Sequence, residues 1–401
     1  MKVLQINTYA TGSTGKIVVQ LHEMLLRNGY ESIVMYGRGN CFHDDFLRCA
    51  KPIEVKAQSL LSKVSGVPYG GCPLSTNRVL RAIDEIKPDV VHLHCLNGYF
   101  INVYKLLNYL KEAGVRTILT LHAEFMYTGG CTHTLGCEKW KSGCSNCPQI
   151  RNGTHPRSWF FDNTKYEWES MRSSFEGFDN LVICPVSDWV RMNAERSPFF
   201  NNGVKISTVN NGVDTSIYHP KDAFALQEMY GKPERKIILH VTPDFSHPLK
   251  GGNRVIELAE MFQERFDDVL FLVIGKADAI EKYPDNIVFV GEISNENKLA
   301  DYYSIADVTL LTSVRETYSM VTVESLCCGT PVVGFRSGGP ESIALREFSL
   351  FFDQADLNGI FGGLIEIMYG TYPKEACAEK ASKLYSAEVM AAQYEKLYRD
   401  E

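Results

Sequence analysis

The chain has 401 residues, of which 45% are hydrophobic and 22% are charged, and its formal net charge is −7. This length exceeds what one hydrophobic core usually serves, so we expect two domains, and the composition excludes a disordered protein. The negative charge argues against a general nucleic-acid binder.

No apolar stretch approaches the roughly 18 residues that cross a bilayer. The first apolar run, in MKVLQINTYATGSTG, is too short for a signal peptide. We therefore expect a cytoplasmic protein, in which the 12 cysteines are reduced thiols or metal ligands rather than disulfides.

Apolar runs typical of buried strands alternate with helical patterns along the first half of the chain. Ile17, Leu21, Met24 and Leu25 have the spacing of one helix face. Such alternation is typical of a parallel sheet with helices on both faces. The predicted strands of this half are 3–6, 32–36, 90–94, 117–122 and 181–186.

The second half repeats the pattern, and a segment rich in turn formers and charge, 210–236, separates the halves. We predict an α/β protein of two doubly wound, Rossmann-like domains, 1–215 and 216–385, with a last helix at 386–401 that packs back on the first. Ligands of such sheets bind outside the carboxyl ends of the strands, so the site is expected in a cleft between the domains. The second half is predicted to have strands at 237–241, 270–275, 287–291, 308–311 and 331–335, with helices that begin near 253, 295 and 317.

Two glycine-containing turns precede predicted helices, where free N–H groups and the helix dipole favour phosphate. TGSTGK, at 11–16, follows the first strand, but an ordinary turn with a Ser or Thr cap explains it equally well. Lys250-Gly251-Gly252 follows the first strand of the second half, where a lysine adds a movable charge that suits a diphosphate. A solvated surface lysine is the alternative.

Two glutamates, Glu316 and Glu324, stand eight residues apart in SVRETYSMVTVESLCCGTPVVGF, whose pattern is strand, turn, helix, turn, strand. Carboxylates accept hydrogen bonds from the vicinal hydroxyls of a ribose or hexose, so this pair suits a nucleotide sugar. The alternatives are a first-turn acid for Glu316 and a solvent-facing helix residue for Glu324.

The segment ETYSMVTVE, followed by SLCCGTPVV, resembles the E-x7-E signature of retaining glycosyltransferases with the GT-B fold, and of glycosyltransferase family 4 in particular. Further landmarks occur in the order of that family, and the resemblance covers nearly the whole chain. They are the glycine loop at 12–15, TLH at 120–122, VSDW at 186–189, NNGVD at 210–214, LKGG at 249–252 and GGPES at 338–342.

The resemblance implies transfer of a sugar from a UDP- or GDP-linked donor with retention at the anomeric carbon, and no cofactor or metal for catalysis. The absence of a D-x-D motif agrees with metal independence. By their places in the motifs, Glu316 and His122 would act at the donor sugar and Lys250 at the diphosphate, which makes these three the expected catalytic residues. The other implied donor contacts are Gly15 near the phosphate, the backbone N–H groups of Tyr318, Ser319 and Met320, and Glu324 at the ribose.

The chain departs from the family's pattern at both ends of the expected donor site. The family's arginine before the lysine is missing from HVTPDFSHPLKGG, and Arg254 and Arg315 are the candidates to replace it. Thr317-Tyr318 stands where many relatives have Phe-Gly. A lone histidine at a strand end is more often a core residue, but the place of His122 at the predicted cleft favours a functional one.

The cysteine-rich insert GGCTHTLGCEKWKSGCSNCPQ, together with STNRVLRAIDEIKPDVVHLHCLNGYFIN and CPQ, resembles the branch of family 4 that builds bacterial exopolysaccharides of the colanic-acid kind. This implies an acceptor glycan, free or carried on polyprenyl diphosphate, and peripheral association with the inner face of the cell membrane. His94, Asn97 and Tyr99 are the expected acceptor-side residues. For KAQSLLSKVSGVPYGG, at 56–71, a plain surface helix and loop is favoured over a membrane-facing segment.

Four cysteines lie close together in GGCTHTLGCEKWKSGCSNCPQ, which ends in C-x2-C. Four thiolates in a cytosolic chain are compatible with a tetrahedral structural zinc that clips a short loop. We expect zinc at Cys131, Cys137, Cys144 and Cys147, with His133 as a weaker candidate ligand and four free thiols as the alternative.

Two other functions stay open at this point. A GT-B nucleotide-sugar epimerase would release no nucleotide, and a non-catalytic partner of a polysaccharide assembly complex would bind nucleotide without turnover. Catalytic transfer is favoured because Glu316, Glu324 and Lys250 are all present.

Overall fold

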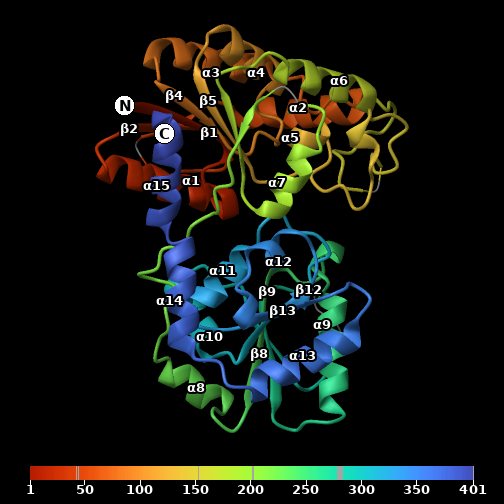
Figure 1. Cartoon of the computed structure of the whole chain (residues 1–401). Coiled ribbons are helices and arrows are strands. Elements are labelled where there is room, and N and C mark those ends of the chain that lie inside the picture. Colours follow the sequence, from red (N-terminus) through yellow and green to blue (C-terminus); the bar gives the residue numbers. More distant parts are fainter. Residues whose placement is uncertain (42, 44, 152, 201–202, 278–282, 401) are drawn as a thin grey trace. The chain divides into compact units, whose positions relative to one another are not determined.

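The structure is a computed structural model that describes residues 1–41, 43, 45–151, 153–200, 203–277 and 283–400 (Figure 1). The chain divides into two compact units, Met1–Asn210 with Met390–Glu401, and Asn211–Val389. Each unit is built on a parallel sheet flanked by helices, which confirms the predicted α/β class with two Rossmann-like domains. Within the described residues no helix is both long and apolar enough to cross a membrane.

The sheet of the first unit has the strand order β3-β2-β1-β4-β5-β6-β7. The five predicted strands are confirmed, whereas β3 and β7, of 3 and 2 residues, were missed because such short runs carry no periodicity. The strands are β1 Lys2–Tyr9, β2 Glu31–Arg38, β3 Phe46–Arg48, β4 Val90–Leu93, β5 Arg116–Leu121, β6 Leu181–Pro185 and β7 Lys205–Ile206.

Several helices of the first unit bury an apolar face against this sheet or against one another. Ile17, Leu21 and Leu25 of α1 are fully buried, as their spacing predicts. The helices here are α1 Gly12–Arg27, α2 Pro52–Ser65, α3 Pro73–Ile86, α4 Val103–Glu112, α5 Phe125–Thr128, α6 Thr164–Phe175 and α7 Asp188–Glu195, with a 3-10 turn, η1, at Lys139–Lys141.

The sheet of the second unit has the order β10-β9-β8-β11-β12-β13, and its core includes the fully buried Ile238, Phe271 and Val308. Five strands are as predicted, and β13 at the edge was missed. The strands are β8 Lys236–Asp244, β9 Val269–Lys276, β10 Ile287–Gly291, β11 Val308–Leu311, β12 Val332–Phe335 and β13 Ser349–Phe352.

Helices α9 and α13 pack together on one face of the second sheet, and α10, α11 and α14 pack together on the other. The charged segment 210–236 contains a helix, α8, and belongs to the second unit. The elements are α8 Phe224–Tyr230, α9 Gly252–Gln263, α10 Glu296–Ile305, α11 Met320–Cys327, α12 Gly339–Ile343, α13 Leu357–Tyr369 and α14 Lys374–Tyr385, with 3-10 turns η2 Pro248–Lys250 and η3 Arg346–Phe348.

The last helix, α15 Ala387–Arg399, begins in the second unit and ends in the first. Its fully buried Tyr394 and Tyr398 place their hydroxyls 2.8 Å from Thr120 Oγ1 and 2.7 Å from His92 Nδ1. Arg116 also donates to the carbonyl of Leu397, at 2.6 Å. The end of the chain therefore completes the core of the first unit.

In each sheet the strand order reverses at one point, between β1 and β4 in the first unit and between β8 and β11 in the second. The loops after these strands part at the carboxyl edge and leave the usual ligand crevice of a doubly wound sheet. Gly12 follows β1 and Asn97 follows β4, while Lys250 follows β8 and Glu316 follows β11. The residues singled out in the sequence thus gather at the two reversal points.

Candidate active site

Lys250 and Glu316, far apart in the sequence, form an ion pair at the reversal point of the second sheet. Lys250 Nζ lies 2.6 Å from Glu316 Oε1, and the two side chains are 27% and 23% exposed. Partial exposure leaves the pair open to a ligand while water screens it less than at the surface. The lysine predicted to bind phosphate and the glutamate predicted to bind sugar therefore lie in direct contact.

The turn that carries Lys250 is docked on the segment after β11. Thr312 Oγ1 donates to the carbonyl of Lys250 at 2.8 Å, and the N–H of Val314 donates to Leu249 at 2.9 Å. Gly251 has φ +69°, and a Cβ there would meet the Thr312 carbonyl oxygen at 2.2 Å. The glycine is thus required by the backbone, and it lets the lysine turn sit against the glutamate turn.

Glu316 lies in extended backbone rather than in a helix. Its N–H donates to Ser337 at 3.0 Å and its carbonyl accepts from Gly339 at 2.8 Å, so the segment pairs with the chain after β12. The prediction that a helix begins near Thr317 is wrong, because the helix begins at Met320 after Ser319, which has φ +96° and caps it. The interpretation of Glu316 as a first-turn acid fails for the same reason.

The expected donor N–H groups stand at the start of α11, where a helix has no internal acceptors for them. Ser319 uses its hydroxyl to accept from the N–H of Thr322, at 3.2 Å. The Tyr318 side chain is buried, and its hydroxyl donates to Asn211 at 2.7 Å, so a role for this residue toward a ligand falls to its backbone. That role stays a prediction.

Glu324 lies about one turn into α11 and is half-buried rather than solvent-facing. The hydroxyl of Tyr303 donates to Glu324 Oε2 at 2.9 Å. Burial, followed by the negative charge of Glu324, raises the pKa of both Tyr218 and Tyr303 well above the usual value, so both stay protonated beside the carboxylate. Nothing in the sequence signalled these two tyrosines.

In the first unit, His122 and His94 form part of a chain of stacked histidines at the ends of β5 and β4. His122 Nε2 lies 3.2 Å from His94 Nδ1. Burial lowers the pKa of His122 to about 4, so its ring is neutral at pH 7. His94 is 1% exposed and contacts Gln5 on its other nitrogen, so it supports His122 rather than lining a pocket.

Gly15 sits in the first turn of α1, close to the end of β1. A Cβ at Gly15 would meet the backbone carbon of Ala10 at 2.8 Å. Close packing of the helix on the strand end therefore explains this glycine without a ligand. Its role near a phosphate stays a prediction.

A cavity of 310 Å³ opens at the carboxyl edge of the first sheet. Asn97 and Tyr99, both predicted on the acceptor side, line it. Arg38, at the end of β2, lines it as well, and its guanidinium lies 5.1 Å from the centre of the Tyr9 ring. Within the described part of the chain this arginine has no carboxylate partner. Its place just after the predicted strand 32–36 is the signal that could have identified it from the sequence.

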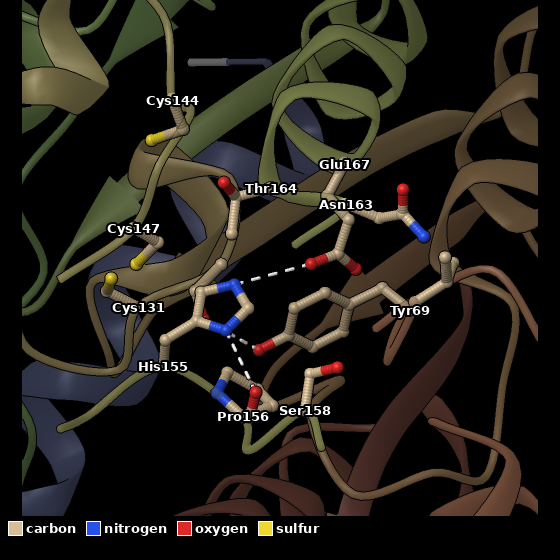
Figure 2. A network of polar contacts seen from close by, with 12 residues as sticks. Tyr69, Cys131, Cys144, Cys147, His155, Pro156, Ser158, Asn163, Thr164 and Glu167 are labelled. Carbon is tan, nitrogen blue, oxygen red and sulfur yellow. Dashed lines mark hydrogen bonds and ion pairs between the residues drawn. The ribbon is translucent and has the colours of Figure 1, made fainter. Parts of the chain in front are cut away.

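His155, which was not predicted, also lines this cavity, and Figure 2 shows it beside Glu167 and Tyr69. His155 Nε2 lies 3.3 Å from Glu167 Oε2, and both side chains are buried. Burial raises the pKa of Glu167 to about 7. The hydroxyl of Tyr69, which also lines the cavity, donates to the carbonyl of Gly130 at 3.0 Å. This hydrogen bond connects the lining of the cavity to the loop after α5.

The four predicted zinc ligands line one small cavity of 20 Å³, together with His155 and Trp140. Cys131, Cys144 and Cys147 lie on one side of His155 (Figure 2). His133 instead lies 3.4 Å from Glu124. Across the described residues, no three or more His, Cys, Asp or Glu side chains already stand in a metal-binding arrangement.

Comparison with known proteins agrees with this architecture. Residues 14–217 match the family model described as Glycosyltransferase Family 4, and residues 224–383 match Glycosyl transferases group 1. The putative colanic acid biosynthesis glycosyl transferase WcaC of Escherichia coli (strain K12) is 21% identical over 100% of both chains. N-acetyl-alpha-D-glucosaminyl L-malate synthase of Bacillus anthracis is 25% identical over 49% of this chain and 54% of its own.

Among solved structures, Anabaena HepE in complex with UDP is similar with a TM-score of 0.65 at 15% identity, covering 100% of each chain. This likeness shows the shared GT-B fold. The family model of the first half alone spans 14–217, about half of the 401 residues, and the match continues in the second half. The chain is therefore a glycosyltransferase of the GT-B type and belongs to glycosyltransferase family 4.

Proposed function

We propose that the protein moves a sugar from a nucleotide diphosphate sugar to a glycan or lipid-linked glycan acceptor, with retention at the anomeric carbon, in bacterial surface polysaccharide synthesis. The observation that carries the proposal is the pair of Lys250 and Glu316 at the reversal point of the second sheet, with Glu324 on the helix that follows. Similarity to WcaC over the full length supports the polysaccharide setting.

In this proposal the bound donor separates the ion pair, because Lys250 then contacts the diphosphate and Glu316 contacts the sugar. Without a ligand, the charges of Lys250 and Glu316 neutralise each other at 2.6 Å. A diphosphate offers Lys250 more negative charge than one carboxylate does, and released Glu316 can then accept hydrogen bonds from the sugar hydroxyls. Glu324, oriented by Tyr303, would hold the ribose.

The chemical demand is to stabilise the departing nucleoside diphosphate and the positive charge left on the sugar. Lys250 and the N-termini of α9 and α11 supply positive potential that stabilises the departing nucleoside diphosphate. His122 is neutral at pH 7, so it suits a hydrogen bond to a sugar hydroxyl rather than a charge contact. We propose that no metal takes part, in keeping with the missing D-x-D motif.

A binding and turnover series tests this function. UDP, GDP and their common sugars are added at about 100 times the dissociation constant, where binding to the folded state contributes about 2.7 kcal/mol of stability. Nucleotides of one family, UDP or GDP, are expected to raise the melting temperature. When an extract that contains the acceptor is added to the matching nucleotide sugar, the enzyme is expected to release the nucleotide. UDP sugars come first because HepE binds UDP.

The outcomes separate the alternatives. Binding followed by nucleotide release supports a transferase. Binding without release for any acceptor would favour the non-catalytic partner, and conversion of the free donor sugar without release would favour an epimerase. No shift with any nucleotide would contradict the proposed donor site.

For the acceptor we propose the 310 Å³ cavity of the first unit, with an acidic group on the sugar that it holds. Arg38 is the fixed positive charge among the described lining residues, and Tyr9 and Tyr99 offer ring faces for a sugar. The relative from Bacillus anthracis is named as the synthase of N-acetyl-alpha-D-glucosaminyl L-malate, a product that contains the acid malate. Carboxylate and phosphate are both compatible with Arg38.

Replacing Arg38 by glutamine is expected to weaken binding of acidic sugars about tenfold, because a charge-assisted hydrogen bond is lost. Glucuronic acid, glucose 1-phosphate and glucose are compared by saturation-transfer NMR, and the two acids distinguish carboxylate from phosphate. Arg172→Gln is the matched control, since Arg172 also lies over an aromatic ring, that of Trp168, at 5.8 Å. Equal binding of glucose and both acids would contradict the proposal.

We further propose that the four cysteines hold a structural zinc. Their cavity of 20 Å³ has room for one water-sized guest, and all four cysteines line it. Among its described residues, the loop between α5 and α6 has the turn η1 as its only regular structure, so a cross-link would stabilise it.

Metal analysis of freshly purified protein is expected to find about one zinc per chain. Cys147→Ser should lose it, because a three-thiolate site binds more weakly, whereas Cys41→Ser, at a free cysteine outside the cavity, should keep it. Zinc content near zero in the unaltered protein would defeat the proposal.

A further inference from the structure

Helix α2 of the first unit has its apolar side chains on its exposed face. Ile53, Leu60, Leu61 and Val64 are 74%, 54%, 60% and 38% exposed. Their spacing is that of one helix face. The opposite face buries Gln58 and Ser62, two polar residues, together with Val55. A surface helix normally has the reverse arrangement, so the outward stripe needs an explanation.

A run of three exposed aromatic residues lies beside this stripe. Trp159, Phe160 and Phe161, in the loop before α6, are 43%, 67% and 58% exposed. The N–H of Trp159 donates to the carbonyl of Lys63 at 2.7 Å. Asn163 donates to the carbonyl of Ser65 at 2.6 Å. The loop is therefore fastened along the C-terminal half of α2, and the two segments form one apolar surface.

Basic side chains lie along this surface, and the exposed acid next to it, Asp162, accepts hydrogen bonds from the N–H groups of Cys147, at 2.6 Å, and Thr164, at 3.0 Å. Lys51 and Lys56 on or beside α2 are exposed, and so is Arg157 just before the aromatic run. Lys63 Nζ lies 5.9 Å from the centre of the Trp159 ring. The one acid of α2, Glu54, is turned to Arg78 on α3, at 2.9 Å, and does not cancel the lysines. The patch thus combines apolar and aromatic side chains with basic ones.

We propose that this patch, formed by Ile53, Leu60, Leu61, Val64, Trp159, Phe160 and Phe161, docks the protein on the surface of a membrane that contains anionic phospholipid. Aromatic and aliphatic side chains would enter the boundary between headgroups and acyl chains. The basic side chains would contact the headgroups. Exposed aromatic side chains next to basic ones fit an anionic lipid surface better than a protein surface, because a bilayer lets the rings insert below its charged headgroups.

The patch also lies next to the cavity proposed for the acceptor. Pro68 and Tyr69, which follow α2, line that cavity, as do Thr154, His155 and Pro156, which precede the aromatic run. A membrane-docked protein would therefore present the cavity close to a lipid-linked glycan. This link to the acceptor depends on the proposed function, whereas the docking itself does not.

Vesicle flotation tests the docking with the full chain. Binding is expected to vesicles of phosphatidylglycerol and phosphatidylethanolamine, to be weaker on phosphatidylcholine, and to fall partly with added salt. The double variant Phe160→Ser/Phe161→Ser is expected to lower vesicle affinity at least about tenfold, because two apolar rings no longer enter the membrane. A second double variant, Leu60→Ser/Leu61→Ser, should act in the same direction.

The control is Phe224→Ser, which removes an equally exposed ring, 69%, from α8 of the second unit and should leave flotation unchanged. Melting temperature and nucleotide binding in vesicle-free buffer should stay at the wild-type level in all three variants, so that a failure of docking is not confused with a failure of the donor site. Wild-type protein that floats with none of the vesicles would overturn the proposal. So would self-association that the Phe160/Phe161 variant abolishes while flotation persists.

Discussion

Replacing Lys250 by alanine is expected to lower kcat about 10²- to 10³-fold, because the leaving diphosphate loses its nearest cationic donor. The backbone around Lys250 should persist, since its carbonyl is held by Thr312 and the neighbouring turn depends on Gly251 rather than on the lysine side chain. Steady-state release of the nucleotide from the donor identified by the thermal-shift panel measures the effect. Binding of the free nucleoside diphosphate should weaken as well.

The matched control for this variant is Lys380→Ala. Lys380 belongs to an ion pair of similar length, 2.8 Å to Glu347, but both side chains are more than half exposed and lie on α14 and η3. An exposed pair of this kind contributes little to stability, so this variant should keep the wild-type rate and melting temperature. A Lys250→Ala enzyme within about threefold of the wild-type rate would remove Lys250 from the catalytic machinery.

The larger part of the fold could be predicted from periodicity alone. Long apolar runs such as 3–6 and 270–275 predicted central strands, because central parallel strands are buried on both faces. Strands β3, β7 and β13 lie at sheet edges, where short and half-exposed runs carry little pattern. The helix start near Thr317 failed because the left-handed backbone of Ser319 is not marked by glycine or asparagine.

Some residues of the candidate site could likewise be predicted from the sequence, and others could not. Lys250 and Glu316 were predictable because each follows a recognisable strand, and parallel strands bring their ends together at one edge. His155 and Tyr303 reach their places through loop and helix packing, for which single-sequence patterns hold no signal. For 56–71 the sequence favoured a plain surface helix and loop over a membrane-facing segment, and only the structure shows that the apolar side chains of α2 point outward.

Replacing Glu316 by glutamine is expected to have opposite effects on binding and on turnover. Transfer should fall about 10²- to 10³-fold, because the amide is a weaker acceptor for the sugar hydroxyls that gain charge in the transition state. Binding of the free nucleoside diphosphate should instead become equal or tighter, since Lys250 no longer has to leave a carboxylate 2.6 Å away. Calorimetry with the free nucleotide and rate measurements on the same preparation separate the two effects. The matched control, Glu347→Gln, breaks the exposed pair with Lys380 and should change neither quantity. Weaker nucleotide binding by Glu316→Gln would mean that the carboxylate holds Lys250 in place for the diphosphate, and the proposed exchange of partners would then be wrong.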